Sequence, residues 1–166
     1  MSLVALNEKG NSGIETYDFN CGGFALGTFD WYEPISYQDL SWSGDPINEI
    51  LETLAGEILH DFPFLQRVKH PDLVPKHIKV IGFRFEVSED YDNYDEEEEM
   101  YGEYIRDFHF AVRYDGVWYD KPGPHEIREL PVKDIFDPWV FADFWYDSEI
   151  AWFIDPTNEL LHDYRD

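Results

Sequence analysis

The only cysteine of the chain lies in the stretch Asn20-Cys21-Gly22-Gly23-Phe24-Ala25-Leu26-Gly27. Asn is a favoured N-cap residue, so this stretch predicts a short helix that begins at Cys21. Each of its glycines weakens such a helix by roughly 1 kcal/mol relative to alanine, so something other than helix propensity must favour them. A thiol at a helix N-terminus faces unpaired backbone N–H groups and the positive end of the helix dipole, which favours the thiolate. Cys21 is therefore a candidate nucleophile, and the alternative is a small buried apolar side chain.

A second stretch, Asp107-Phe108-His109-Phe110-Ala111-Val112-Arg113, predicts a strand with a histidine near its centre. An imidazole among apolar neighbours is costly unless it has a polar partner. A nucleophilic cysteine needs a histidine that is distant in the sequence and close in the fold. His109 is the candidate base, and the alternative is a core histidine bonded to a backbone carbonyl.

The third stretch turns the chain back beside this strand. Asp115-Gly116 is a strong hairpin signal, and Val117-Trp118-Tyr119-Asp120 follows it. If the turn centres on residues 115 and 116, paired positions sum to about 231, so Asp120 lies diagonal to His109. Asp120 is the preferred group to hold the imidazole in one tautomer, with Asp107 and His125 as alternatives.

These three stretches together resemble the papain-like cysteine hydrolase superfamily near the NlpC/P60 family, in particular its small bacterial and phage members. The matching residues are 20–27, 107–113 and 115–123, and they occur in the family's order of cysteine, histidine and polar residue. The resemblance implies an α+β, papain-like fold in which the nucleophile helix and an additional helix pack on an antiparallel β-sheet. It also implies that Cys21, His109 and Asp120 are the catalytic residues. NlpC/P60 enzymes usually have Asp-Cys-Ser-Gly where this chain has Asn20-Cys21-Gly22-Gly23, and their third residue is often His.

The rest of the chain is consistent with one domain over residues 1–166, with an irregular lead-in at 1–15. Apolar residues recur at helical spacing behind Asp45-Pro46, and Pro63 ends that helix. Residues 89–99 are strongly acidic and are interpreted as a solvated loop. Strands are predicted at 77–87, 104–114, 117–120 and 149–154, and a short helix at 157–164.

The chain carries 12 basic and 36 acidic residues, for a net charge of −24. Such a surface repels nucleic-acid phosphate and anionic membranes, so we expect neither as a partner. The same charge motivates an alternative function as a catalytically inactive acidic binding protein: an immunity protein, an inhibitor or a decoy that mimics DNA. The partner would then be a basic protein.

Several other features narrow the chemistry. A single cysteine excludes an intrachain disulfide and a zinc site built from several thiolates, and we expect neither a metal nor a cofactor. An oxyanion hole would combine the Cys21 backbone N–H with a second donor from Asn20 or Tyr17. The first residues show no signal peptide, so the cytoplasm is the default compartment, with secretion through a signal already removed as the alternative.

The sequence therefore predicts a cysteine-dependent hydrolase of amide bonds, with isopeptide and thioester bonds as further options. The reaction would pass through an acyl-enzyme on Cys21. Its substrate would be a peptide-like or acyl compound, whose identity the sequence leaves open.

Overall fold

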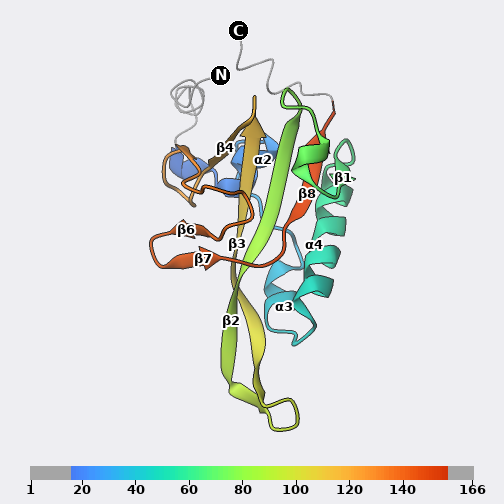
Figure 1. The fold of residues 1–166 in the computed structure, drawn as a ribbon, viewed down its shortest axis with the longest axis vertical. Coiled ribbons are helices and arrows are strands. Elements are labelled where there is room, and N and C mark those ends of the chain that lie inside the picture. The colour runs from blue at the N-terminus through green and yellow to red at the C-terminus, as the bar shows by residue number, and fades with distance from the viewer. Residues whose placement is uncertain (1–15, 157–166) are drawn as a thin grey trace.

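The fold is built around the strand that carries His109. In the computed structural model, which describes residues 16–156, the chain is an α+β protein with a six-stranded antiparallel sheet in the order β1-β8-β2-β3-β4-β5 (Figure 1). The helices are α2 (Cys21–Leu26), α3 (Tyr37–Ser41) and α4 (Ile47–Asp61), with 3-10 turns at Thr16–Asp18 and Pro71–Leu73. The strands are β1 (Gln66–Val68), β2 (Lys79–Asp95), β3 (Met100–Tyr114), β4 (Val117–Asp120), β5 (Arg128–Glu129), β6 (Trp139–Phe141), β7 (Phe144–Tyr146) and β8 (Ala151–Asp155).

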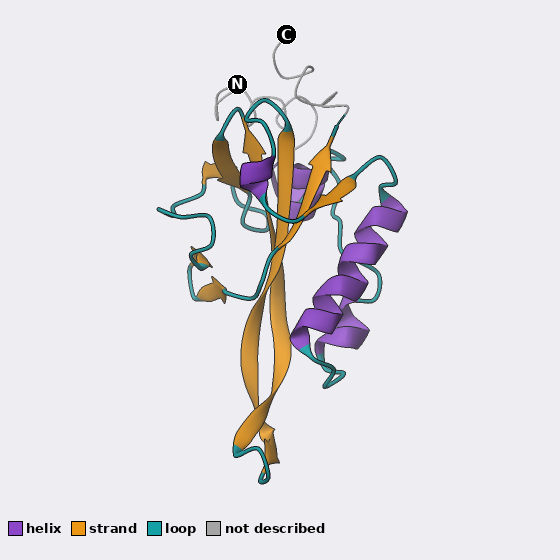
Figure 2. Ribbon diagram, turned by 45° about the vertical axis from the view of Figure 1, so that its right-hand side comes forward, coloured by secondary structure: helices purple, strands orange, loops and turns teal. Residues whose placement is uncertain are grey.

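One face of the sheet is covered by helices. The buried side chains of α4 are Ile50, Leu51, Leu54, Ala55 and Ile58, whose three- and four-residue spacing places them on one stripe. They share a core with α2 and with the alternate residues of β2 and β3 that point the same way. The helix begins at Ile47, and Pro46 is its N-cap. Figure 2 shows α4 alongside the strands.

The other face is covered by the segment that follows β5. Trp139 and Trp152 are buried here against Val80 and Ala111. Arg84 reaches across from β2 and donates hydrogen bonds to the carbonyls of Ser148 and Asp137. These bonds fix the segment that carries the β6–β7 hairpin, which borders the site described below.

Beyond the body of the molecule β2 and β3 continue as a two-stranded ribbon (Figure 1). The expectation of a loop over residues 89–99 is therefore wrong for residues 89–95, which belong to β2 with a register shift between Asp90 and Tyr94, and residues 96–99 form the turn. Tyr101 explains the pairing, because its ring packs on Tyr91 and Tyr94 at 5.2 and 5.0 Å. Such cross-strand aromatic contacts stabilise a strand pair whose acidic composition alone would favour a loop.

The predicted hairpin register is confirmed. Asp120 pairs with Ala111, and Asp115 and Gly116 take positive φ values of 50° and 84° at the turn. The predicted lead-in at 1–15 and helix at 157–164 lie outside the described residues. Within the described part of the chain, no helix is both long and apolar enough to cross a membrane.

Candidate active site

Cys21 is the first residue of α2, as the sequence predicts. Asn20 is the N-cap, and its Oδ1 accepts a hydrogen bond from the Gly23 N–H at 3.0 Å. The same oxygen accepts from the Tyr32 N–H at 3.0 Å, while Nδ2 donates to the Tyr32 carbonyl at 2.7 Å. Asn20 therefore joins the start of the helix to the following loop and holds Cys21 in place.

The glycines after Cys21 allow that loop to pack closely on the helix. A Cβ atom on Gly23 would lie 1.7 Å from the Asp30 carbonyl oxygen. A Cβ on Gly22 would lie 2.9 Å from the Tyr32 carbonyl oxygen. This close approach is the requirement that outweighs the poor helix propensity of glycine.

His109 and Asp120 come together through the register of the β3–β4 hairpin. β4 ends at Asp120, opposite Ala111, and α2 packs against β3 and β4 at this end of the pairing. Nε2 of His109 donates to Oδ2 of Asp120 at 2.8 Å, and both side chains are buried. Tyr146 stacks on the imidazole, with ring centroids 4.7 Å apart and planes 17° apart. The ring is thereby fixed by a hydrogen bond at its edge and an aromatic contact on its face.

Cys21 interacts with the same imidazole. Both residues line one cavity, Cys21 contributes to the raised pKa of His109, and Nδ1 is the ring nitrogen that the Asp120 bond leaves open. Burial opposes a charged imidazole, but the negative charges of Cys21 and Asp120 outweigh burial and raise the pKa of His109 to about 9. Asp120 therefore binds an imidazole whose protonated form is favoured, and Cys21 lines the same cavity as that imidazole.

Arg128 also binds Asp120. From β5 its Nε donates to Oδ1 of Asp120 at 2.8 Å and its Nη2 to Oδ2 at 3.0 Å, while Nη2 also donates to the Val140 carbonyl. Burial would raise the pKa of Asp120, but the hydrogen bonds from His109 and Arg128 hold it below its usual value. Asp120 is therefore ionised although fully buried.

A second cation lies beneath the start of α2. The ammonium of Lys121, which is fully buried, donates to the carbonyls of Phe19 and Gly123 and lies 4.3 Å from the centre of the Phe19 ring. Burial lowers the pKa of Lys121 to about 8, and the charge of Cys21 opposes this decrease. Lys121 thus ties the segment before Cys21 to the loop after β4.

Cys21 and His109 line a cavity of about 340 Å³. Its walls are largely aromatic: Trp31, Tyr37, Phe108, Phe141, Phe144 and Tyr146. Its other polar lining residues are Asn20, Glu33, Gln38, Asp107 and His125. The cavity gives a ligand access to a thiol whose side chain is otherwise buried.

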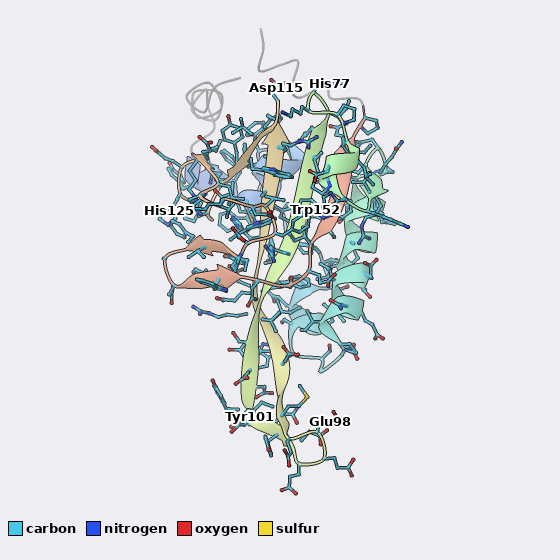
Figure 3. All side chains as sticks on the ribbon, in the orientation of Figure 1. His77, Glu98, Tyr101, Asp115, His125 and Trp152 are labelled. Carbon is cyan, nitrogen blue, oxygen red and sulfur yellow. The ribbon has the colours of Figure 1, made fainter. Side chains whose placement is uncertain are left out.

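The sequence also offered Asp107 and His125 as partners of the imidazole, and Tyr17 and Asn20 as oxyanion donors. Asp107 accepts a hydrogen bond from the Tyr146 hydroxyl at 2.6 Å, and His125 packs on Phe141 at the cavity wall. Figure 3 shows His125 on the side of the β6–β7 hairpin. Tyr17 is 65% exposed and does not line the cavity, while the Asn20 amide already donates to Tyr32.

Sequence reasoning missed Arg128, Lys121 and Tyr146. Arg128 lies in a two-residue strand that no alternation pattern marks, so nothing indicated that it faces Asp120. Lys121 lies in the quoted stretch 115–123, where a lysine next to Asp120 gave a usable signal. Tyr146 follows a segment whose path over the sheet depends on tertiary contacts.

Comparison with known protein families, with curated proteins and with solved structures finds no match for this chain.

Proposed function

We propose that this protein is a papain-like cysteine hydrolase that cleaves amide, isopeptide or thioester bonds through an acyl-enzyme on Cys21. The observation that carries the proposal is that Cys21 lines the same aromatic cavity as His109, whose Nε2 is bound to Asp120. A nucleophile, a base and a group that orients the base are the three parts that such catalysis requires. The nucleophile begins a helix that packs on an antiparallel sheet, which is the arrangement that the papain-like resemblance implies.

The proposed reaction has two halves. In the reactive state the proton of Cys21 is already on His109 Nδ1, and the thiolate attacks the carbonyl carbon of the substrate. The tetrahedral intermediate collapses as Nδ1 gives that proton to the leaving amine or thiol, which leaves a thioester on Cys21. Nδ1 then takes a proton from water, the hydroxide attacks the thioester, and the proton returns to Cys21 as the carboxylic acid leaves.

Each step depends on a fixed imidazole. Asp120 holds Nε2 and stabilises the positive charge of the ring, and Arg128 keeps Asp120 ionised. Helix geometry leaves the N–H groups of Cys21 and Gly22 without intrahelical acceptors, so these are the donors available to a developing oxyanion. Asn20 supports this arrangement by capping the helix at Gly23.

The acyl-enzyme gives the most direct test. The protein is mixed with p-nitrophenyl acetate and its intact mass is followed, together with the release of nitrophenol. We expect one acetyl group on Cys21 and a burst of nitrophenol, both lost in Cys21→Ala and slowed at least 100-fold in His109→Gln. Acetylation of Cys21 at the same rate in His109→Gln would reject the proposed base.

The ribbon supports a second candidate, an acidic binding protein. Between residues 88 and 103 it carries nine acidic and no basic residues. Tyr91 and Tyr94 are exposed on it, and Figure 3 shows Glu98 and Tyr101 at its far end. A basic protein partner would bind in a salt-dependent way. Such binding would survive Cys21→Ala and be lost when residues 96–99 are changed to Gln, whereas the hydrolase shows the opposite pattern.

A further inference from the structure

The cavity beside Cys21 combines carboxylates with aromatic walls. Glu33 and Asp107 both line it and both are half-buried. Among the described residues that line the cavity, none is Lys or Arg. Arg106, which directly precedes Asp107 in the sequence, pairs with Glu86 and Asp143. Of the basic groups that line the cavity, His109 is bound to Asp120, and no lysine or arginine of the described lining neutralises the two carboxylates.

Tyr37 links the two carboxylates to one region of the cavity. Tyr37, Glu33 and Asp107 all line the cavity, and the negative charges of Asp107 and Glu33 add to burial in raising the pKa of Tyr37. Asp107 is also two residues from His109 on β3 and accepts a hydrogen bond from Tyr146, which stacks on that imidazole. Asp107 therefore lies on the same face of β3 as His109, and it lines the cavity that Cys21 also lines.

The walls of the cavity also suit a cation. Trp31, which is 56% exposed, and Tyr37 line the cavity together with Glu33. The faces of such rings attract ammonium groups, and this attraction strengthens where water is excluded. The net charge of −24 adds a long-range field that draws cations to the molecule and repels anions.

We propose that Glu33 and Asp107 form a subsite for a protonated amine, so that the preferred substrate carries an ammonium group close to the carbonyl that Cys21 attacks. This inference rests on the proposed function and names its substrate class. The ammonium is either a free N-terminal amine or a basic side chain, because both present the same charge to the subsite. The acidic surface then has a role in catalysis, as the field that concentrates a cationic substrate.

Charged thiol reagents test the subsite without needing turnover. Cys21 is reacted with the trimethylammonioethyl and the sulfonatoethyl methanethiosulfonates, which both form a mixed disulfide and release methanesulfinate. For each protein, the rate of Cys21 modification by the cationic reagent is divided by the rate with the anionic reagent. Dividing this ratio by the one measured for 2-mercaptoethanol gives a corrected ratio, free of the intrinsic reactivities of the two reagents. We expect a corrected ratio of at least about ten, as two unit charges a few ångströms away produce in a partly aqueous site.

Variants separate the subsite from the general field. Asp107→Asn and Glu33→Gln should each lower the corrected ratio about three- to tenfold. Glu49→Gln removes the same charge from an exposed position on α4 and should change it less than twofold. A corrected ratio near one overturns the inference, and so does an equal decrease in all three variants.

A protection assay then identifies the source of the ammonium. Alkylation of Cys21 by iodoacetamide is measured with alaninamide, N-acetyl-lysinamide or N-acetylalaninamide present. Protection by alaninamide indicates an N-terminal amine and protection by N-acetyl-lysinamide a side chain, while protection that ignores charge counts against the subsite. Failure of the hydrolase proposal can be told apart from failure of the subsite. If His109 does not activate Cys21, His109→Gln leaves the rate with neutral methyl methanethiosulfonate unchanged. The corrected charge ratio still decides whether the subsite exists.

Discussion

Arg128 binds Asp120 through both oxygens of its carboxylate, with Nε donating to Oδ1 at 2.8 Å and Nη2 to Oδ2 at 3.0 Å. Oδ2 also accepts the hydrogen bond from His109, so one buried carboxylate orients both cations. Removing a carboxylate from water is costly unless its lone pairs are satisfied, and these three bonds offset that cost. The candidate catalytic chain therefore runs from Arg128 through Asp120 and His109 to Cys21.

Replacing Arg128 should weaken both the fold and the site. Arg128→Met leaves Asp120 buried with His109 as its remaining charged partner, so we expect the free energy of unfolding to fall. The decrease should be about 2 kcal/mol and not larger, because Arg128 is partly exposed and solvent screens its charge. Arg128→Lys keeps the charge but loses the two-point geometry and should recover only part of this loss. Urea denaturation measures both variants, and a stability equal to the wild type in Arg128→Met would contradict the role assigned to the pair.

Lys121 makes a second stability prediction. Lys121→Met keeps most of the side-chain volume but leaves the carbonyls of Phe19 and Gly123 without their shared donor. We expect unfolding to become easier by about 2 to 4 kcal/mol and the alkylation of Cys21 to slow, because a nearby positive charge is lost. The exposed Lys133→Met is the matched control and should change stability by less than about 0.5 kcal/mol. Equal effects of the two substitutions would show that the buried ammonium has no structural role.

Two helical glycines should respond in opposite directions to alanine. Gly23→Ala forces a Cβ to within 1.7 Å of the Asp30 carbonyl, so the loop must move and we expect a loss of at least about 3 kcal/mol. Gly56 lies within α4, where a Cβ meets nothing within 4 Å, so Gly56→Ala should stabilise the protein by about 0.5 to 1 kcal/mol. Thermal unfolding measures both, and a neutral Gly23→Ala would disprove the close approach.

The parts of the fold that depend on local pattern were predictable. The N-cap at Asn20, the helix at Cys21 and the register of the 115–116 hairpin follow from turn and cap chemistry, and the structure has all three. These features involve residues that are near neighbours in the sequence. The register alone brought Asp120 to the side of His109.

Other features depend on contacts that no local pattern encodes. The acidic composition of residues 89–95 favours a loop, and their pairing depends on Tyr101 across the ribbon. Arg128 faces Asp120 only because β5 adds two residues to the sheet edge. The path of the segment over Trp139 depends on Arg84, which is more than fifty residues away in the sequence.

The raised pKa of His109 predicts a pH dependence of stability. The folded protein binds this proton more tightly than the unfolded chain, with a pKa of about 9 against an ordinary 6.5. The stabilisation is therefore complete below pH 6.5 and is lost as the pH rises through 9. Between these limits the advantage of the wild type over His109→Gln should shrink by about 3 kcal/mol. An advantage that stays constant or grows with pH would contradict the charged imidazole.

That comparison isolates His109 from other buried groups. Lys121, whose pKa is lowered to about 8, has the opposite sign: it costs stability when protonated and ceases to do so as the pH rises. This contribution is present in both proteins and cancels to first order in the difference between them. Urea denaturation of the two proteins at matched pH values gives the difference directly.

The rate at which iodoacetamide alkylates Cys21 between pH 4 and 9, in the wild type and in His109→Gln, tests the central claim most directly. If His109 and Cys21 form an ion pair, the wild-type rate stays high well below pH 8.5, where a free cysteine ionises, and His109→Gln is at least tenfold slower at pH 6. A wild-type rate that rises only near pH 8.5 and is the same in His109→Gln would contradict the account.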